Sequence, residues 1–313
     1  MEFFEKWFLG FFREDRLTVR NFNPYTPRGL DEIQYPRQWR NVRFVGSRGS
    51  TLCIANVADG EVAIWEPLSG RHSILPPAEI PHGWGLSVYG FGYNGKHDRN
   101  DDDDQDEFVL LRVDQTLRSP IVSQFSIYRQ ADSTIQTTNT WTRLQAMPYY
   151  LNEPARMGVF DGSRLYWLMR RYPVRNSEKV LVGFNIYTES FMEEDLPNAI
   201  DNRLRMDLAA FEDRLWLTVY GEVGVVDVWI RTQSSSERPW ERLFSLRDHW
   251  WSLRPIQPVD ISRSIIGPRI LMEVGGPTKI LSLYNLITNK VEQFELIDMP
   301  RYFDKAIPLW LQG

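Results

Sequence analysis

An internal repeat that occurs five times is the feature of this sequence that most constrains its fold. Each copy has a short apolar run, a β-rich run after a turn, a run with a central aromatic residue, and a last run that commonly ends near Leu-Pro or Met-Pro. The aromatic residues of the third runs define a register, because they recur at separations of 60, 59, 45 and 55 residues: Trp65, Phe125, Phe184, Trp229 and Tyr284. Four short strands repeated roughly every 40 to 50 residues are typical of β-propeller blades.

Two remainders supply a sixth blade in this interpretation. The N-terminal remainder contains three strand-like runs, at residues 7–12, 16–22 and 30–36, and the C-terminal one contains a run at 301–311. One sheet made from both remainders would remove the exposed edges of an open arc. We therefore predict an all-β fold, a single six-bladed propeller over residues 1–313, with five blades in 46–297 and a closing blade shared by 1–45 and 298–313.

The first runs of the third and fifth copies have defined positions in this interpretation. We expect the first strand of the third copy at residues 156–162 and that of the fifth copy at 263–266. Asp161-Gly162 predicts a hairpin turn, since glycine accepts a positive φ without steric cost. The glycine-rich stretch 83–95 lacks the pattern of a nucleotide-binding loop, and its glycines are expected to allow a close approach of backbone at the inner strand of a blade.

The charge of the chain is concentrated in one short segment. The formal net charge is −5, and residues 95–107 alone hold two basic and seven acidic side chains, which leaves 34 of each sign elsewhere. A mildly acidic chain without a basic excess does not fit a general nucleic-acid or anionic-membrane binder. We expect the acidic run 101–107 to be a solvated loop between two strands, because like charges repel; a Ca²⁺ site is the sharper alternative, although four consecutive aspartates cannot all face one ion.

No motif in the sequence predicts catalysis, a metal or a cofactor. The four histidines are far apart, no G-x-S-x-G is present, and Cys53 lies in an apolar strand pattern where a buried, inert thiol is the ordinary outcome. Because Cys53 is the single cysteine, it forms no intrachain disulfide, which favours a reducing compartment, cytoplasmic or nuclear. Residues 1–12 are aromatic but interrupted by charges, so we expect neither a signal peptide nor a membrane span.

Several stretches, in order, resemble the F-box-associated, kelch-like propeller region of plant F-box proteins. The matching stretches are V-G-S-R-G-S-T-L-C-I-A-N (45–56), A-I-W-E-P-L-S-G-R-H-S-I-L-P-P (63–77), S-V-Y-G-F-G-Y (87–93), D-E-F-V-L-L-R-V (106–113), G-V-F-D-G-S-R-L-Y-W (158–167), V-G-F-N-I-Y-T-E-S-F (182–191), D-V-W-I-R (227–231) and W-E-R-L-F-S-L (240–246). The resemblance covers roughly residues 42–297.

The resemblance implies a non-catalytic module that recognises a protein substrate for a cullin-type ubiquitin ligase. It carries over no catalytic residue. The F-box that docks such proteins on a Skp-type adaptor is not recognisable in residues 1–40, so we do not expect this chain to bind the adaptor.

Aromatic residues in the expected connections between blades are the candidate partner-binding residues. They are Trp84, His249, Trp250 and Trp251. Loops on a rigid scaffold commonly carry recognition, and tryptophan is enriched at interface anchors; the alternative is that these rings fold back over blade edges. A second hypothesis is a propeller that binds or hydrolyses carbohydrate, which the aromatic content of 13% motivates and a glycan array would test.

Overall fold

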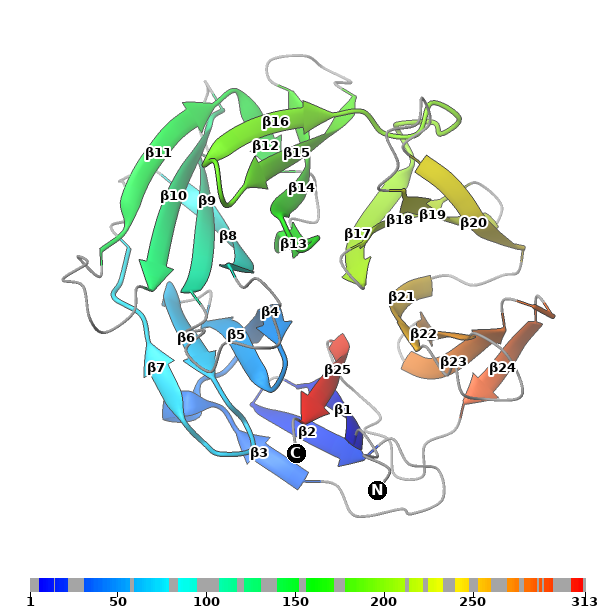
Figure 1. Cartoon of the computed structure of the whole chain (residues 1–313), viewed down its shortest axis with the longest axis horizontal. Coiled ribbons are helices and arrows are strands. Elements are labelled where there is room, and N and C mark those ends of the chain that lie inside the picture. The colour runs from blue at the N-terminus through cyan, green and yellow to red at the C-terminus, as the bar shows by residue number, and fades with distance from the viewer. Residues whose placement is uncertain are drawn as a thin grey trace, which may run out of the picture.

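The computed structural model describes twenty-five strands, in six antiparallel sheets around one central axis (Figure 1). The described residues are 6–13, 15–21, 31–56, 59–78, 84–94, 107–116, 121–130, 140–151, 156–171, 178–211, 214–221, 225–232, 240–247, 253–259, 269–275, 279–285, 287–288, 290–294 and 305–311. Within this part of the chain the one helix is a short 3-10 turn, η1 (Pro36–Gln38). The prediction of an all-β propeller is confirmed.

Each sheet is an antiparallel meander that starts beside the central axis and ends at the outside. From inner to outer strand, sheet 1 contains β25 (Lys305–Leu311), β1 (Lys6–Phe12), β2 (Arg16–Asn21) and β3 (Asp31–Gln34), and sheet 2 contains β4 (Val42–Arg48), β5 (Thr51–Asn56), β6 (Glu61–Trp65) and β7 (His72–Ile74). Sheet 3 contains β8 (Trp84–Asn94), β9 (Glu107–Thr116), β10 (Ser123–Gln130) and β11 (Thr142–Met147).

The remaining three sheets follow the same order. Sheet 4 contains β12 (Tyr149–Leu151), β13 (Val159–Phe160), β14 (Arg164–Arg171), β15 (Lys179–Asn185) and β16 (Ser190–Glu194). Sheet 5 contains β17 (Arg205–Phe211), β18 (Arg214–Tyr220), β19 (Val225–Arg231) and β20 (Trp240–Arg247), and sheet 6 contains β21 (Leu253–Val259), β22 (Arg269–Gly275), β23 (Lys279–Asn285) and β24 (Lys290–Phe294).

The register predicted from the five aromatic residues is confirmed. Each of them lies on the third strand of its sheet, and four are at least 98% buried: Trp65, Phe125, Phe184 and Tyr284. Trp229 occupies the same place on β19 and is half-buried. These large side chains fill the space between neighbouring sheets, which is how each propeller blade covers the apolar face of the next.

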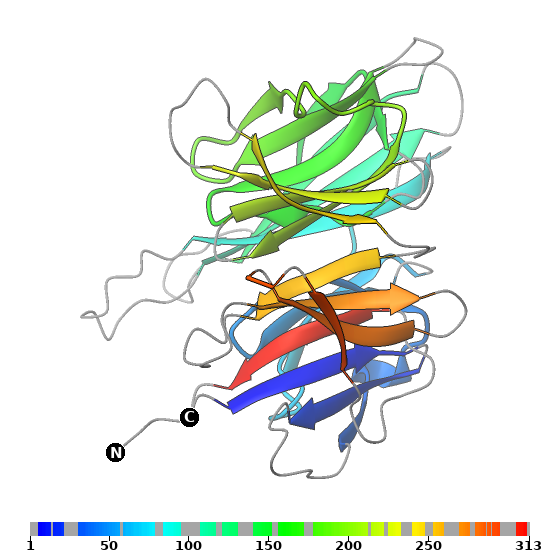
Figure 2. The same cartoon turned by 90° about the vertical axis from the view of Figure 1, so that its right-hand side faces the viewer.

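The two ends of the chain contribute to one sheet. Strand β25 pairs with β1 over seven residues, from Lys6 opposite Leu311 to Phe12 opposite Lys305. Figure 2 shows β25 lying beside β1. The runs predicted at 7–12, 16–22, 30–36 and 301–311 correspond to β1, β2, β3 and β25, so sheet 1 is the shared blade that we expected.

The inner strands differ most from the sequence-based expectation. Sheet 2 begins at Val42, ahead of the boundary expected at residue 45, and the inner strand of sheet 6 is β21, whereas the run at 263–266 lies outside the described residues. Strand β21 contains Pro255 and Pro258, and prolines within a run argue against predicting a strand there. The fold accepts them because β21 is an edge strand that pairs with β22 alone.

In sheet 4 the inner strand is broken into two short pieces. Strands β12 and β13 both pair with β14, and residues 156–158, which precede β13, are outside the ladder. The continuous first strand expected at 156–162 is therefore wrong, because 156–158 form a connector and the strand is limited to Val159 and Phe160. The predicted hairpin turn is present, with Gly162 at φ +91°.

Neighbouring sheets pack against one another mainly through their inner strands, without a ladder between the sheets among the described residues. Contacts run around the axis from β4 to β8, from β8 to β13 and β14, from β13 to β17, from β17 to β21, from β21 to β25 and from β1 to β4. The close approach expected at the glycine-rich stretch is confirmed on β8: a Cβ at Gly90 would lie 2.6 Å from the Trp167 ring of sheet 4, and one at Gly92 would lie 3.1 Å from Phe160.

The meander defines two faces of the propeller. Since each four-strand meander ends at the face where it began, all inner strands begin at the same face, which we call the start face. The turns between inner and second strands, and between third and outer strands, lie at the opposite face, which we call the end face. No helix in the described ranges is long and apolar enough to cross a membrane.

Candidate recognition site

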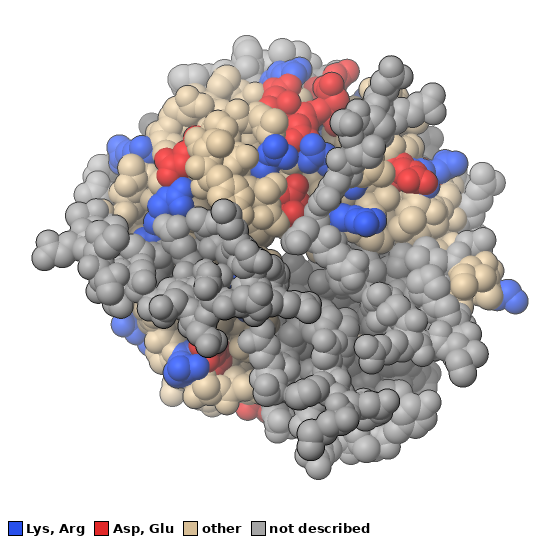
Figure 3. All heavy atoms as spheres, in the orientation of Figure 1, with Lys and Arg blue, Asp and Glu red and all other residues tan. Residues whose placement is uncertain are grey.

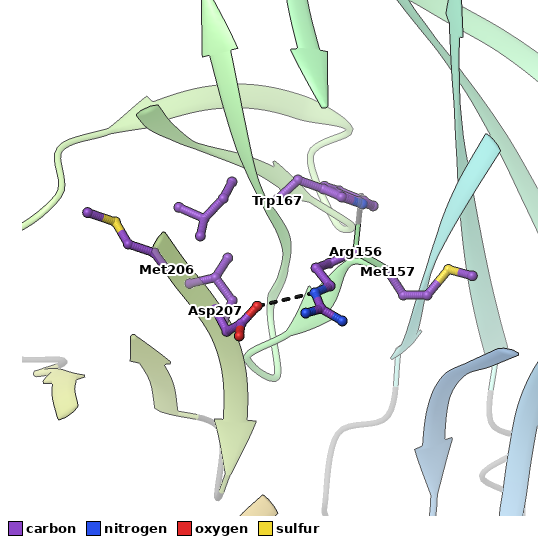
Figure 4. A pocket seen from close by; sticks show the side chains of 7 residues that line it. Arg156, Met157, Trp167, Met206 and Asp207 are labelled. Atoms are coloured by element: carbon purple, nitrogen blue, oxygen red, sulfur yellow. Dashed lines mark ion pairs between the residues drawn. The ribbon is translucent and has the colours of Figure 1, made fainter. Parts of the chain in front are cut away.

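A small pocket lies where sheets 4 and 5 meet (Figure 4). It is lined by the connector between β12 and β13, by the middle of β14 and by the first half of β17: Arg156, Met157, Trp167, Leu168, Met206, Asp207 and Leu208. Strand β17 begins at Arg205, so the pocket lies toward the start face. Apolar walls with a few polar groups are the usual composition of a binding site.

Two hydrogen bonds fix the connector before β13 to strand β8 of the neighbouring sheet. Gly158 N donates a hydrogen bond of 2.7 Å to the carbonyl of Tyr89 on β8, and Tyr89 N donates to the Met157 sulfur at 3.2 Å. A Cβ at Gly158 would lie 2.4 Å from the Trp167 ring, so glycine is required for the connector to pass there. These contacts hold Arg156 in place at the pocket.

Two guanidinium groups share one carboxylate at the pocket. Arg156 Nε lies 3.2 Å from one carboxylate oxygen of Asp207, and Arg205 Nη2 lies 3.2 Å from the other. The side chain of Asp207 is 16% exposed, whereas those of Arg156 and Arg205 are 43% and 40% exposed. The site therefore carries one net positive charge that faces solvent.

Both arginines keep unused donors. Figure 4 shows Arg156 directing its Nε toward Asp207 and its terminal nitrogens away from that carboxylate. Arg205 lies over the ring of Tyr220, 4.4 Å from the centroid, which stabilises its orientation. A guanidinium has five N–H donors in a fixed fork, so one ion pair leaves most of them available to a ligand.

Trp167 adds an unpaired donor to the pocket wall. Its side chain is 2% exposed, and its indole nitrogen makes no hydrogen bond with any residue in the described part of the chain. Gly90 on one side and Gly158 on the other hold the ring. A buried N–H without an acceptor costs free energy, so an acceptor that reached it would be bound favourably.

A second polar network joins sheets 4 and 5 nearer the end face. Arg231 pairs with Glu194 at 2.7 Å and donates to the Tyr166 hydroxyl, which in turn donates to Glu194 at 3.0 Å. Burial, with Asp161 and Glu194 nearby, raises the pKa of Tyr166 above its ordinary range and keeps this hydroxyl a donor. Figure 3 shows charged side chains of both signs close together over these two sheets. The network satisfies its own members and serves to join the sheets.

A third polar cluster is enclosed between sheets 2 and 3. Arg112 donates from Nε to Asp114 at 2.8 Å, Ser87 donates to the same carboxylate at 2.5 Å, and both charged side chains are almost fully buried. Arg112 also reaches the Ala78 carbonyl at 3.5 Å, so it ties the chain between the two sheets. Such a pair is inaccessible to a partner and has a structural role.

Comparison with known proteins decides the family. A sequence profile of the F-box associated beta propeller domain matches residues 28–266, which is most of the chain. The chain belongs to this family.

One curated F-box associated relative illustrates the relationship. F-box protein At3g07870 of Arabidopsis thaliana is 22% identical over 215 residues, which cover 64% of this chain and 50% of the relative. The chain thus spans about half the length of this relative. Solved structures are more distant: apo AztD from Citrobacter koseri has 11% identity and a TM-score of 0.43, covering 97% of this chain and 98% of its own. The acylaminoacyl peptidase of Pyrococcus horikoshii has 10% identity and a TM-score of 0.41, covering 90% and 48%.

The structure places only one of the four predicted partner-binding residues in this F-box associated propeller. Trp84 is the first residue of β8 and pairs with Thr116, so its expected position in a loop is wrong. The cause is a ladder that extends past a register shift between Trp84 and Leu86. His249, Trp250 and Trp251 lie outside the described residues, as does the acidic run up to residue 106, while Glu107 begins β9.

Trp84 nevertheless begins an inner strand, which puts its backbone at the start face. The ends of β20 at Arg247 and of β21 at Leu253 lie at the same face, by the meander order. The connection between residues 247 and 253 therefore leaves and rejoins the described fold at the start face, the face nearer to the pocket.

Sequence reading missed the pocket residues Arg156 and Asp207, and Arg205, which pairs with Asp207. The available signal is the pattern Arg205-Met206-Asp207, which places two charges on one face of an expected inner strand. An inner strand faces the channel and its neighbours, so charges there need partners. The partner, Arg156, is distant in sequence and belongs to an irregular connector, which periodicity does not reveal.

Proposed function

We propose that this chain is a non-catalytic propeller that recognises a protein target at its start face. The observation that carries the proposal is the pocket between sheets 4 and 5, with apolar walls, a half-exposed arginine in its lining and a second one paired with its aspartate, in a chain of the F-box associated family. A rigid ring that presents a polar pocket beside interblade connections is suited to binding a polypeptide segment.

The contacts would come from two parts of the start face. Arg156 and Arg205 would supply charged donors, and Trp84, His249, Trp250 and Trp251, which the sequence predicts as partner-binding residues, would supply aromatic contacts. Tryptophan and arginine are the residues most enriched among interface hot spots. In a protein that also carries an F-box, a target bound here would be presented for ubiquitination; this role rests on the family and on the name of the curated relative.

Quantitative affinity purification from a lysate of the source organism tests the proposal. The bait proteins are the wild type, a Trp84/Trp250/Trp251→Ala variant, and a Leu68/Tyr187→Ala variant as a matched control. Leu68 and Tyr187 are exposed apolar residues in turns between third and outer strands, at the end face. We expect the start-face variant to lose partners that the control retains.

Two further measurements show whether a loss of partners is caused by unfolding of a variant. Thermal unfolding of each bait shows whether it is folded, and a Trp84→Phe variant retains an aromatic ring should Trp84→Ala unfold β8. Partner sets that are identical for wild type and the folded start-face variants would contradict the proposed surface. Partners lost only by the end-face variant would place recognition on the other side.

A further inference from the structure

The pocket between sheets 4 and 5 has more hydrogen-bond donors than acceptors. Its donors are the guanidinium group of Arg156 and the indole N–H of Trp167, and its charged acceptor is Asp207. Arg205 does not line the pocket but contacts Asp207 from beside it and adds a second guanidinium group at its edge. The ion pairs engage one nitrogen of each arginine, and Trp167 Nε1 engages no described residue. The complementary ligand is therefore an acceptor that carries negative charge.

We propose that the pocket binds the carboxylate of an aspartate or glutamate side chain on the target polypeptide. The inference rests on the proposed function and names the chemistry of the target. The carboxylate would accept from the terminal nitrogens of Arg156 and from Arg205, and its flanking carbon atoms would pack against Met157 and Met206.

The charge of the pocket favours a carboxylate over a phosphate. Two arginines and one aspartate leave one positive charge, which a single carboxylate neutralises. A phosphate at neutral pH carries about 1.5 to 2 negative charges and would face repulsion from Asp207. Asp207 therefore acts as a specificity-determining residue: it positions both arginines and limits the charge of the ligand.

The pocket is built to keep this geometry. Arg156 is fixed through Met157 and Gly158 to β8 of sheet 3, whereas Arg205 is fixed by Tyr220 and Asp207 within sheet 5. The two donors thus come from different sheets and converge across the sheet 4 and sheet 5 boundary. A ligand carboxylate would bridge the boundary, so its affinity depends on both arginines.

Selection from a phage library of random dodecapeptides tests the inference with the full chain as bait. We expect the selected peptides to share an acidic residue at one position, and replacement of that residue by Gln to weaken binding. Arg156→Gln is expected to weaken the selected peptides at least about tenfold, the effect of losing one charge-assisted hydrogen bond. The matched control is Arg203→Gln, because Arg203 is 85% exposed, pairs with Asp201, and lies at the same face two residues before Arg205.

Two additional variants separate charge from geometry. Arg156→Lys keeps the charge but loses the planar fork, and we expect it to weaken binding as well. Asp207→Asn raises the pocket charge to two positive units, and we expect it to bind a phosphoserine version of the selected peptide more tightly than the wild type does. Circular dichroism and thermal unfolding identify any variant that does not fold.

The outcomes are distinct. Selected peptides without an acidic residue, or acidic peptides that bind Arg156→Gln as well as the wild type, overturn the carboxylate inference and leave the proposed function standing. A phosphoserine peptide that binds the wild type more tightly than its glutamate version overturns the choice of carboxylate. Failure of the wild type to select any peptide, together with unchanged partners in the affinity purification, overturns the proposed function and this inference with it.

Discussion

At the scale of single residues, two glycines decide how closely the backbone approaches a tryptophan ring between neighbouring sheets. Gly90 on β8 and Gly158 in the connector leave room for the ring of Trp167, and no other residue type fits between that ring and either backbone. This contact positions Arg156 at the pocket, because the connector carries the arginine two residues before Gly158.

Gly158→Ala should therefore be strongly destabilising. The added Cβ would meet the Trp167 ring at 2.4 Å, and overpacking of this kind costs about 1–3 kcal/mol in unfolding free energy. Urea unfolding measures the loss. The control is Gly49→Asn: Gly49 has φ +55° and nothing within 4 Å of a Cβ, and asparagine tolerates this conformation, so we expect a small effect. Equal effects of both substitutions would contradict the packing of Trp167.

Cys53 provides a probe of global unfolding. It is fully buried on β5, and burial raises the pKa of its thiol far above the ordinary value, so the native protein should react negligibly with iodoacetamide. Because it is the single cysteine, intact-mass analysis reads its alkylation directly. We expect labelling to follow the unfolding transition in urea. Rapid alkylation without denaturant would show that sheet 2 opens locally.

At the scale of elements, the third strands of the sheets were predictable from the sequence, whereas the irregular inner strands were not. Third strands were found from their central aromatic residues because each lies between two paired strands, so its side chains alternate into packed spaces. Strand β21 was missed because two prolines interrupt its pattern, and β13 was overextended because the connector before it leaves the ladder. The pocket depends on that connector and was missed for the same reason.

The connection between β16 and β17 is fastened by a buried lysine. Lys179 on β15 donates from Nζ to the carbonyls of Asn202 and Leu204 at 2.6 and 2.7 Å, and the Asn202 side chain bonds both backbone groups of Lys179. Burial, together with the nearby Arg170, lowers the pKa of Lys179 to about 8. The lysine thus secures the segment that leads into Arg205 and the pocket.

This depressed pKa predicts a pH dependence of stability. In the folded state Lys179 releases its proton near pH 8, whereas an unfolded lysine holds its proton until about pH 10.4. Between these values the unfolded chain binds more protons than the folded chain. The free energy of unfolding therefore increases as pH rises, which means that the protein becomes more stable.

Urea unfolding of the wild type and Lys179→Met at pH 7.5, 9 and 10 measures this contribution. We expect the stability of the wild type relative to the variant to increase across the series. Lys290→Met, at an exposed position on β24, is the control and should show no such trend. A difference between wild type and Lys179→Met that does not change with pH would contradict the assignment.

At the scale of the whole molecule, the fold was more predictable than the site. The repeated runs and the two remainders identified the strands and the sheet that β25 and β1 share, since hydrophobic patterning within each run is local. The pocket joins Arg156 of the connector to Asp207 of the next sheet, and only the packed ring brings these residues together.

The central claim is that the target binds at the start face, and photo-cross-linking tests it most directly. A photoreactive benzoylphenylalanine is introduced in place of Arg203, in the connection that leads to β17, or in place of Tyr187, in the end-face turn between β15 and β16; both side chains are exposed. After irradiation in a lysate of the source organism, we expect partner adducts from position 203 and none from position 187. Adducts from position 187 alone, or equally from both, would contradict recognition at the start face.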